Sequence, residues 1–177
     1  MTTYRTREAY EYYAEHILAP LEAKAPTYEE HNLSMEGLVP FRDWEAFIAV
    51  LVDDRGTGQA AGSDLQQHEV KSVRGRGGLE YQYHRRTGLE KLEHDRSLTH
   101  VLIAYDNHYR DLDVYVLPRE RFAEMTERKG WRDRVWSAYF DPDGPTRQRC
   151  RLGISFAEVQ SEGEHIMRIR DGRLVSL

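Results

Sequence analysis

The chain has 177 residues, of which 40% are hydrophobic and 31% are charged. This balance excludes general disorder, and the length predicts one globular domain spanning residues 1–177. No run of about 18 uncharged apolar residues and no secretion signal is present, so we expect a cytoplasmic protein without a membrane-spanning helix. A single cysteine, Cys150, excludes an internal disulfide.

The formal net charge of −5 conceals an uneven distribution of charge. Six basic and two acidic residues lie from Lys71 to Lys91, a local charge of +4, whereas the first forty residues are rich in glutamate. Proteins that bind nucleic acids contact phosphates mainly through lysine and arginine. We therefore expect a basic face on an acidic body, and the negative net charge does not exclude DNA as a partner.

Apolar periodicity predicts a helix over residues 6–22. Its apolar stripe is either a core face or a homodimer interface, and consists of Tyr10, Tyr13, Ile17, Leu18 and Leu21. A polar connection bounded by prolines is expected over residues 26–40. Asp43 then predicts the N-cap of a second helix, which ends before Gly56 and buries Trp44, Phe47, Ile48 and Leu51.

Two strands and a helix are predicted in the second half of the chain. Residues 99–105 form an apolar run typical of a central strand buried on both faces, and residues 112–117 alternate like a neighbouring strand. Pro118 begins a helix that ends near Gly130. Residues 156–160 and 165–169 predict a hairpin, and a further turn is expected at 170–172.

A tight turn is expected at Gln66-Gln67, in the most informative part of the sequence. It would fold Asp64 back against Glu69 as two short antiparallel strands, with about 4.5–5.5 Å between their Cβ atoms. Lys71 lies two residues beyond Glu69 and projects from the same face of a strand. The sequence therefore predicts that two carboxylates and one ammonium group converge.

Two carboxylates at this separation repel each other, and a divalent cation relieves the repulsion by binding oxygen atoms of both. Hard oxygen ligands favour Mg²⁺, which we expect to be bound by Asp64, Glu69 and the backbone carbonyl of Val70. Bound Mg²⁺ can activate water and offset charge on a phosphate, while Lys71 can orient or deprotonate the attacking water. Asp64, Glu69 and Lys71 are thus candidate catalytic residues for phosphodiester hydrolysis.

Alternatives remain open around this cluster. Its simplest interpretation is a solvated hairpin with a surface salt bridge. Asp54 or Asp53 would replace Asp64 as the first metal ligand if Asp64 is displaced. Glu45, on the second helix, is either an acidic residue near the metal or an exposed helix carboxylate. His68 points to the opposite face of the strand from the catalytic residues, so we expect a structural role for it.

The segments Gly62-Ser-Asp64 and His68-Glu-Val-Lys-Ser72 resemble the catalytic motif of the PD-(D/E)XK nucleases, in the form found in type II restriction endonucleases. Within that superfamily the chain is most similar to the PvuII-type enzymes, from Glu69 to about Arg134. The spacer between Asp64 and Glu69 is shorter than the spacer that is usual in that motif. The matching order of elements after the motif is Tyr81-Gln-Tyr-His84, Lys91, the strands 99–105 and 112–117, and the helix from Pro118.

This resemblance implies an α/β fold with a restriction-endonuclease-like core, in which a mixed central sheet is flanked by helices. It also implies Mg²⁺ as cofactor, a cut through both strands of DNA, and a homodimer that reads a palindromic site. The helix over residues 6–22 is the possible dimerisation element.

Candidate DNA-binding residues follow the catalytic motif. Glutamine pairs with adenine, arginine pairs with guanine, and histidine is versatile in the major groove, which favours base contacts by Gln82, His84, Arg85 and Arg86. Arg74 and Arg76 lie in a glycine-rich segment suited to phosphate contacts. The same stretch is alternatively an arginine-rich surface loop.

Two other functions compete with a restriction enzyme. A DNA repair or junction-resolving nuclease would share the same catalytic core but select its substrate by structure. A non-enzymatic DNA-binding or protein-interaction module would carry the acidic and basic trio by accident. Metal dependence of cleavage separates the enzymes from the module.

Overall fold

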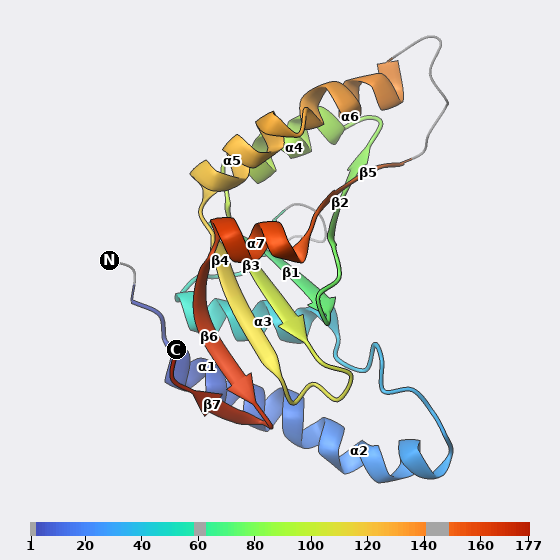
Figure 1. The fold of residues 1–177 in the computed structure, drawn as a ribbon, viewed down its shortest axis with the longest axis vertical. Coiled ribbons are helices and arrows are strands. Elements are labelled where there is room, and N and C mark those ends of the chain that lie inside the picture. Colours follow the sequence, from blue (N-terminus) through green and yellow to red (C-terminus); the bar gives the residue numbers. More distant parts are fainter. Residues whose placement is uncertain (1–2, 59–62, 141–148) are drawn as a thin grey trace.

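The structure is a computed structural model that describes residues 3–58, 63–140 and 149–177 (Figure 1). Its helices are α1 (Thr6–Tyr12), η1 (Tyr13–Leu18), α2 (Ala19–Glu30), α3 (Phe41–Val52), α4 (Gly88–Arg96), α5 (Arg119–Arg128), α6 (Trp131–Phe140) and α7 (Phe156–Glu162). Its strands are β1 (His68–Arg74), β2 (Leu79–His84), β3 (Thr99–Tyr105), β4 (Leu112–Leu117), β5 (Arg149–Ile154), β6 (Glu164–Arg170) and β7 (Arg173–Val175). No helix within these ranges is both long and apolar enough to cross a bilayer.

A mixed five-stranded sheet forms the centre of the described part of the chain. Its strand order is β1-β3-β4-β6-β7, so that β1 is an edge strand. Strands β1 and β3 are parallel, with Glu69 paired to His100, and the remaining neighbours are antiparallel. The expectation of an α/β fold with a mixed central sheet flanked by helices is therefore confirmed.

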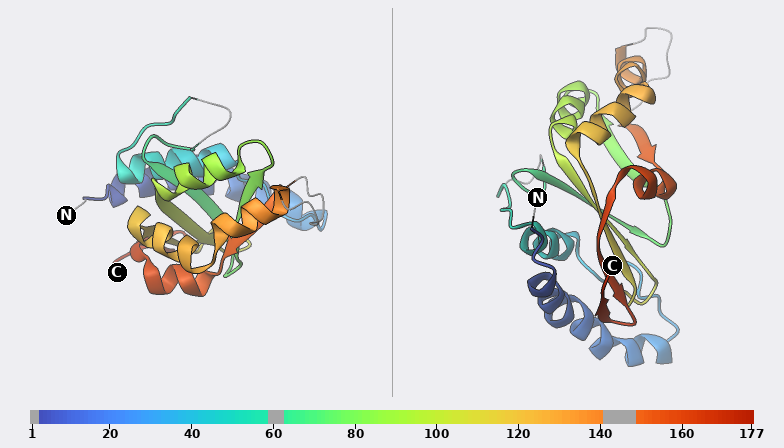
Figure 2. Two further views of the ribbon diagram at one scale, coloured as in Figure 1. Left: turned by 90° about the horizontal axis from the view of Figure 1, so that it is seen from above. Right: turned by 60° about the vertical axis from the view of Figure 1, so that its left-hand side comes forward.

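The two faces of the sheet build two separate hydrophobic clusters. Val101 and Ile103 of β3 pack into a cluster with α1, η1 and α3, whereas Leu102 and Ala104 belong to the other cluster. Because successive side chains of a strand point to opposite faces, one apolar run supplies both clusters. Figure 2 shows the N-terminal helices on one side of the sheet and α7 on the other.

The second cluster is completed by a β-ribbon that lies outside the main sheet. Strands β2 and β5 pair antiparallel, and their inward side chains pack with α4, α5 and α6. Tyr81, Tyr83 and Trp131 are almost fully buried there, and Trp131 contacts both tyrosine rings. The molecule thus has two lobes: an upper lobe of β2, β5 and α4–α6, and a lower lobe of the N-terminal helices and most of the sheet.

The predicted N-terminal helix is longer than its sequence pattern indicated. It continues through a π-helical turn and past Pro26 to Glu30, so the expected connection from Pro26 to Pro40 begins only after the helix ends. Tyr13, Ile17 and Leu21 are nearly inaccessible to solvent because the apolar stripe packs on the lower core. The stripe is a core face, and a homodimer would have to use other surface residues.

Two local predictions were wrong. Helix α3 begins at Phe41 with Pro40 as its N-cap, so Asp43 lies in the first turn and does not cap the helix. Residues 156–160 belong to helix α7 and not to a hairpin, because Ser155 and Glu158 form a capping box that starts a helix. Strand β6 and the turn that leads to β7 were predicted correctly.

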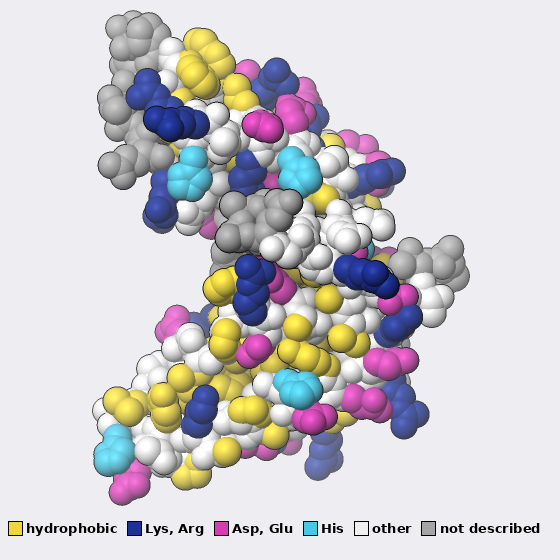
Figure 3. All heavy atoms as spheres, turned by 180° about the vertical axis from the view of Figure 1, so that it is seen from behind, with side chains coloured by type: hydrophobic (Ala, Val, Ile, Leu, Met, Phe, Trp, Pro, Cys, Tyr) yellow, Lys and Arg dark blue, Asp and Glu magenta, His cyan; other side chains and the backbone are white. Residues whose placement is uncertain are grey.

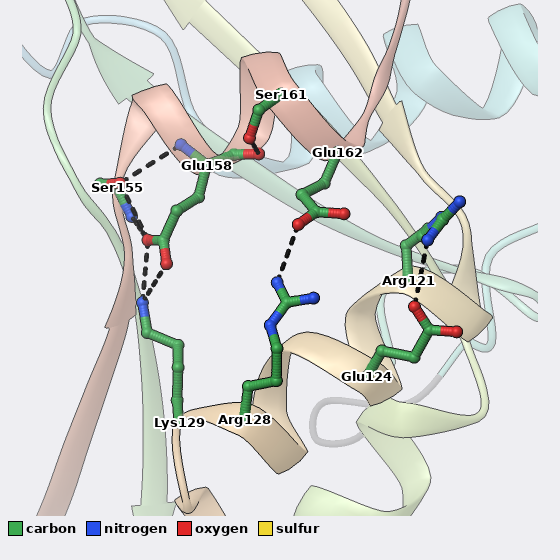
Figure 4. Close-up of polar contacts among 8 residues, drawn as sticks. All are labelled: Arg121, Glu124, Arg128, Lys129, Ser155, Glu158, Ser161 and Glu162. Atoms are coloured by element: carbon green, nitrogen blue, oxygen red, sulfur yellow. Dashed lines mark hydrogen bonds and ion pairs between the residues drawn. The ribbon is translucent and has the colours of Figure 1, made fainter.

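The capping box should contribute measurably to stability. The Ser155 hydroxyl accepts a hydrogen bond from the Glu158 N–H, and Glu158 also binds Lys129, the C-cap of α5 (Figure 4). Ser155→Ala should lower the free energy of unfolding by about 1 kcal/mol, measured by urea denaturation. Ser161→Ala removes a serine at the other end of the same helix and should change it by less than about 0.5 kcal/mol. Equal losses in the two variants would contradict a capping role.

Candidate active site

The turn before β1 brings Asp64 beside this strand. The Leu65 N–H donates to the carbonyl of His68 over 3.0 Å, which closes the expected turn at Gln66-Gln67. The short strand expected at Asp64-Leu65 does not form, because Leu65 makes only an isolated bridge among the described residues, with Gly56. Leu65 is buried in the lower core and holds the turn in place. One carboxylate oxygen of Asp64 then accepts a hydrogen bond from the Val70 N–H over 2.9 Å.

This hydrogen bond also orients the Val70 carbonyl. In a β-strand the N–H and C=O of one residue point to the same side. Because the Val70 N–H reaches Asp64, its carbonyl points to the same open edge of β1, away from β3. The carbonyl that the sequence indicated as a metal ligand therefore points to the same side as Asp64.

Glu69 and Lys71 form an ion pair on one face of β1, in which Glu69 is buried and Lys71 is partly exposed. Lys71 Nζ lies 2.5 Å from Glu69 Oε1, and Glu69 is only 3% exposed. Burial raises the pKa of Glu69, but the charge and hydrogen bond of Lys71 outweigh it and leave the pKa below its ordinary value. Burial likewise opposes the charge of Lys71, and Glu69 raises its pKa overall. The interpretation of this segment as a solvated hairpin with a surface salt bridge is therefore wrong.

Asp64 experiences the opposite electrostatic effect. Burial, together with repulsion from Glu69, raises its pKa to about 6, although Lys71 and the Val70 N–H act against this. Glu45 of α3 adds to the repulsion, which puts this carboxylate within electrostatic range of Asp64. Glu45 is itself largely buried and pairs with Arg42, so it is not an exposed helix carboxylate.

Asp54 and Asp53 are occupied elsewhere. The Asp54 carboxylate accepts hydrogen bonds from the backbone N–H groups of Arg55 and Gln67, and it bonds to His68 Nδ1 over 2.7 Å. It thereby fixes the turn that carries Asp64. Asp53 pairs with a surface arginine. The geometry favours Asp64 over both alternatives as the first ligand, and it gives His68 the structural role expected from the sequence.

Several groups around Glu69 were not assigned a role from the sequence. His100 is fully buried, and burial lowers its pKa to about 4, so it is neutral at pH 7. Its Nε2 donates to the carbonyl of Asp95, and its Nδ1 accepts from Tyr81, each over 2.9 Å. Lys91 binds the buried Asp95. The helical i,i+4 spacing of this lysine and aspartate was the available signal.

A groove of about 650 Å³ opens at the ion pair, between α4 and the outer face of β2. Its lining includes Glu69 and Lys71 together with the predicted base-reading residues Gln82 and His84. Figure 3 shows, from behind, a hollow between the upper and lower lobes. Glu69 and Lys71 thus share one concave surface with these two reading residues, whereas Asp64 is not among the residues that line it.

The other predicted DNA-binding residues lie outside this lining. Arg74, at the end of β1, pairs with Glu36 over 2.5 Å, and Arg76 lines a separate cavity with residues of β4 and β6. Arg85 and Arg86 are exposed in the turn after β2. Their contact with DNA stays a prediction.

The charges and orphaned groups of the site fit a divalent cation. Glu69 Oε2 is buried and has no hydrogen-bond partner among the described residues, and the raised pKa of Asp64 reflects burial together with the nearby negative charge of Glu69. No group of three or more His, Cys, Asp or Glu side chains within the described ranges is arranged to hold a metal. The candidate site is of a different kind, because only two of its ligands are carboxylate side chains and the third is a backbone carbonyl. Such a site leaves coordination positions for water and phosphate.

Comparison with known protein families and with curated proteins gives no match for this sequence. Conclusions about the site therefore depend on its geometry.

The raised pKa of Asp64 predicts an unusual effect of substitution on stability. Between about pH 4 and pH 6 the folded protein holds a proton on Asp64 that the unfolded chain releases, so stability falls as pH rises through this range. In EDTA at pH 7.5, Asp64→Asn should therefore raise the free energy of unfolding, by about 1–2 kcal/mol after allowance for partial exposure.

Urea denaturation across pH 3.5–8 would measure this effect. The gain should disappear at the lowest pH, where Asp64 is protonated in both states. Asp53→Asn is the matched control, because this exposed carboxylate should change stability by less than about 1 kcal/mol at any pH. A loss of stability in Asp64→Asn at pH 7.5 would contradict the electrostatic account.

Proposed function

We propose that the protein is a Mg²⁺-dependent endonuclease of the PD-(D/E)XK superfamily that cuts double-stranded DNA at a short specific site, as type II restriction enzymes do. The observation that carries this proposal is the ion pair of the buried Glu69 with Lys71 on an edge strand, with Asp64 beside it and a groove in front of it. A surface accident would not bury a carboxylate with one oxygen unpartnered. The mixed sheet with β1 at its edge is compatible with the implied restriction-endonuclease-like core.

Each residue of the cluster has a chemical role in this proposal. Asp64, Glu69 and the Val70 carbonyl would hold Mg²⁺, which when bound lowers the pKa of water and offsets charge on a phosphate. Lys71 keeps its charge because Glu69 raises its pKa, so it acts as a hydrogen-bond donor that orients the attacking water and stabilises charge on the phosphate. Glu45 adds negative charge near the metal without binding it.

The β-ribbon supplies the means to select a sequence. A two-stranded ribbon fits the major groove of B-DNA. The outer face of this ribbon presents polar side chains from both strands: Glu80, Gln82 and His84 from β2, opposite Arg149 and Arg151 from β5. Gln82 contacts both Glu80 and Arg149, so the reading groups are ordered before DNA binds. This favours a sequence-specific enzyme over a junction-resolving one.

A homodimer belongs to the same proposal. One chain carries one catalytic cluster, whereas cutting both strands of a palindromic site needs two clusters related by twofold symmetry. The dimer surface would lie outside the buried stripe of the N-terminal helix.

Removing the catalytic groups should abolish cleavage without abolishing DNA binding. Asp64→Asn or Lys71→Ala should slow Mg²⁺-dependent cleavage of a supercoiled plasmid by about 100-fold or more, because each removes a group that acts in the chemical step. Gel-shift assays in EDTA should give near wild-type affinity for Asp64→Asn and a weaker but measurable affinity for Lys71→Ala, which loses one phosphate contact. Asp53→Asn should cleave like the wild type. Equal cleavage by the wild type in EDTA and in Mg²⁺ would exclude the metal-dependent mechanism.

Changing a base-reading residue of the ribbon should affect the sequence preference of DNA binding more than its salt dependence. His84→Ala should reduce the preference for the cognate site, by about 10-fold or more for a base contact worth 1–3 kcal/mol, with little change in salt dependence. Competition binding between cognate and unrelated duplexes measures this preference. Arg128→Ala, on a residue outside the groove lining, should leave the preference unchanged. A uniform loss of affinity across all sequences would contradict base reading by His84.

A further inference from the structure

A second lysine lies at the ion pair, contributed by α4. Lys91 Nζ is 4.0 Å from the same oxygen of Glu69 that Lys71 contacts at 2.5 Å, so the two ammonium nitrogens are at most 6.5 Å apart. Both lysines line the groove, and the Lys91 side chain is 30% exposed. Two donors this close can bind oxygen atoms of one phosphate group from two sides.

The surroundings of Lys91 repeat those of Lys71. Asp95, which is fully buried, receives two short contacts from Lys91 of 2.8 and 2.9 Å. Lys71 lies over the ring of Tyr81 at 5.3 Å, and Lys91 lies over the ring of Tyr83 at 5.7 Å. Each ammonium group thus has its own carboxylate and its own aromatic face from β2, which holds it in position at the groove.

We propose that Lys91 is a second phosphate-binding residue of the site, which contacts the same DNA phosphate as Lys71, and that Asp95 positions it. Glu69 is already paired with Lys71, so Lys91 is not needed to neutralise it. This inference deepens the proposed function and rests on it.

The salt dependence of DNA binding tests the contact without any cleavage. Binding of a mixed-sequence duplex would be measured in EDTA at several salt concentrations. In Lys91→Gln/Asp95→Asn, which leaves no buried carboxylate unpaired, the slope of log K against log salt should become shallower by about 0.9, the value for one lost phosphate contact. Lys91→Arg, which keeps the charge, should retain the wild-type slope.

The matched control is the pair of Lys129 and Glu158, which has the same geometry outside the groove lining. Lys129 Nζ contacts both Glu158 oxygens at 2.7 and 2.8 Å and is 27% exposed (Figure 4). Lys129→Gln/Glu158→Gln keeps a capping residue at the start of α7 and should leave the slope unchanged.

The outcomes separate this inference from the proposed function. Circular dichroism would first confirm that Lys91→Gln/Asp95→Asn is folded. If the salt-dependence slope of this folded variant is unchanged, the assignment of Lys91 is overturned. Mg²⁺-dependent cleavage by the wild type would in that case still support the proposed nuclease. A shallower slope without any Mg²⁺-dependent cleavage by the wild type would support the phosphate contact and overturn the nuclease. Absence of duplex binding by the wild type in EDTA would overturn the phosphate contact, and absence of Mg²⁺-dependent cleavage as well would overturn the nuclease.

Discussion

The neutralisation of Glu69 is the constraint on which the site depends. A carboxylate at an almost fully buried position is costly unless it is paired, and only one of its two oxygens is paired with Lys71. The second oxygen has no hydrogen-bond partner among the described residues, and burial together with repulsion from Glu69 raises the pKa of the nearby Asp64 carboxylate. The protein therefore keeps a locally unfavourable arrangement, which is typical of sites that bind a cation or carry out chemistry.

The parallel pairing of β1 with β3 determines where this charge lies. Strand β1 forms the sheet edge, so one side of its backbone is free to meet Asp64 while the other side pairs with β3. The same pairing sets Glu69 beside His100, which is held neutral by burial and bonds to Tyr81 and to the carbonyl of Asp95. The polar cluster thus sits where the apolar interiors of the two lobes meet.

Local signals predicted some elements well and others poorly. Strands β3 and β4 were predicted from apolar runs and helix α5 from a proline start, because these signals lie within the segments themselves. The ribbon of β2 and β5 was not predicted, since its strands are far apart in sequence and pair only in the folded chain. The residues of α7 were read as a strand, although Ser155 and Glu158 carried a helix start signal. The N-terminal helix passes Pro26 where local preference indicated an end.

The sequence by itself determined the types of candidate catalytic group and the face they share: a strand at Glu69 to Lys71 necessarily projects both side chains together, and Asp64 lies one short turn away. Only the tertiary structure decided that Glu69 is buried, that Asp54 supports the turn, and that Lys91 approaches from α4. These features depend on contacts between segments that are distant in the chain. The energies of those contacts depend on how deeply the groups are buried and on the distances between their charges. The spacing of residues in the sequence gives neither quantity.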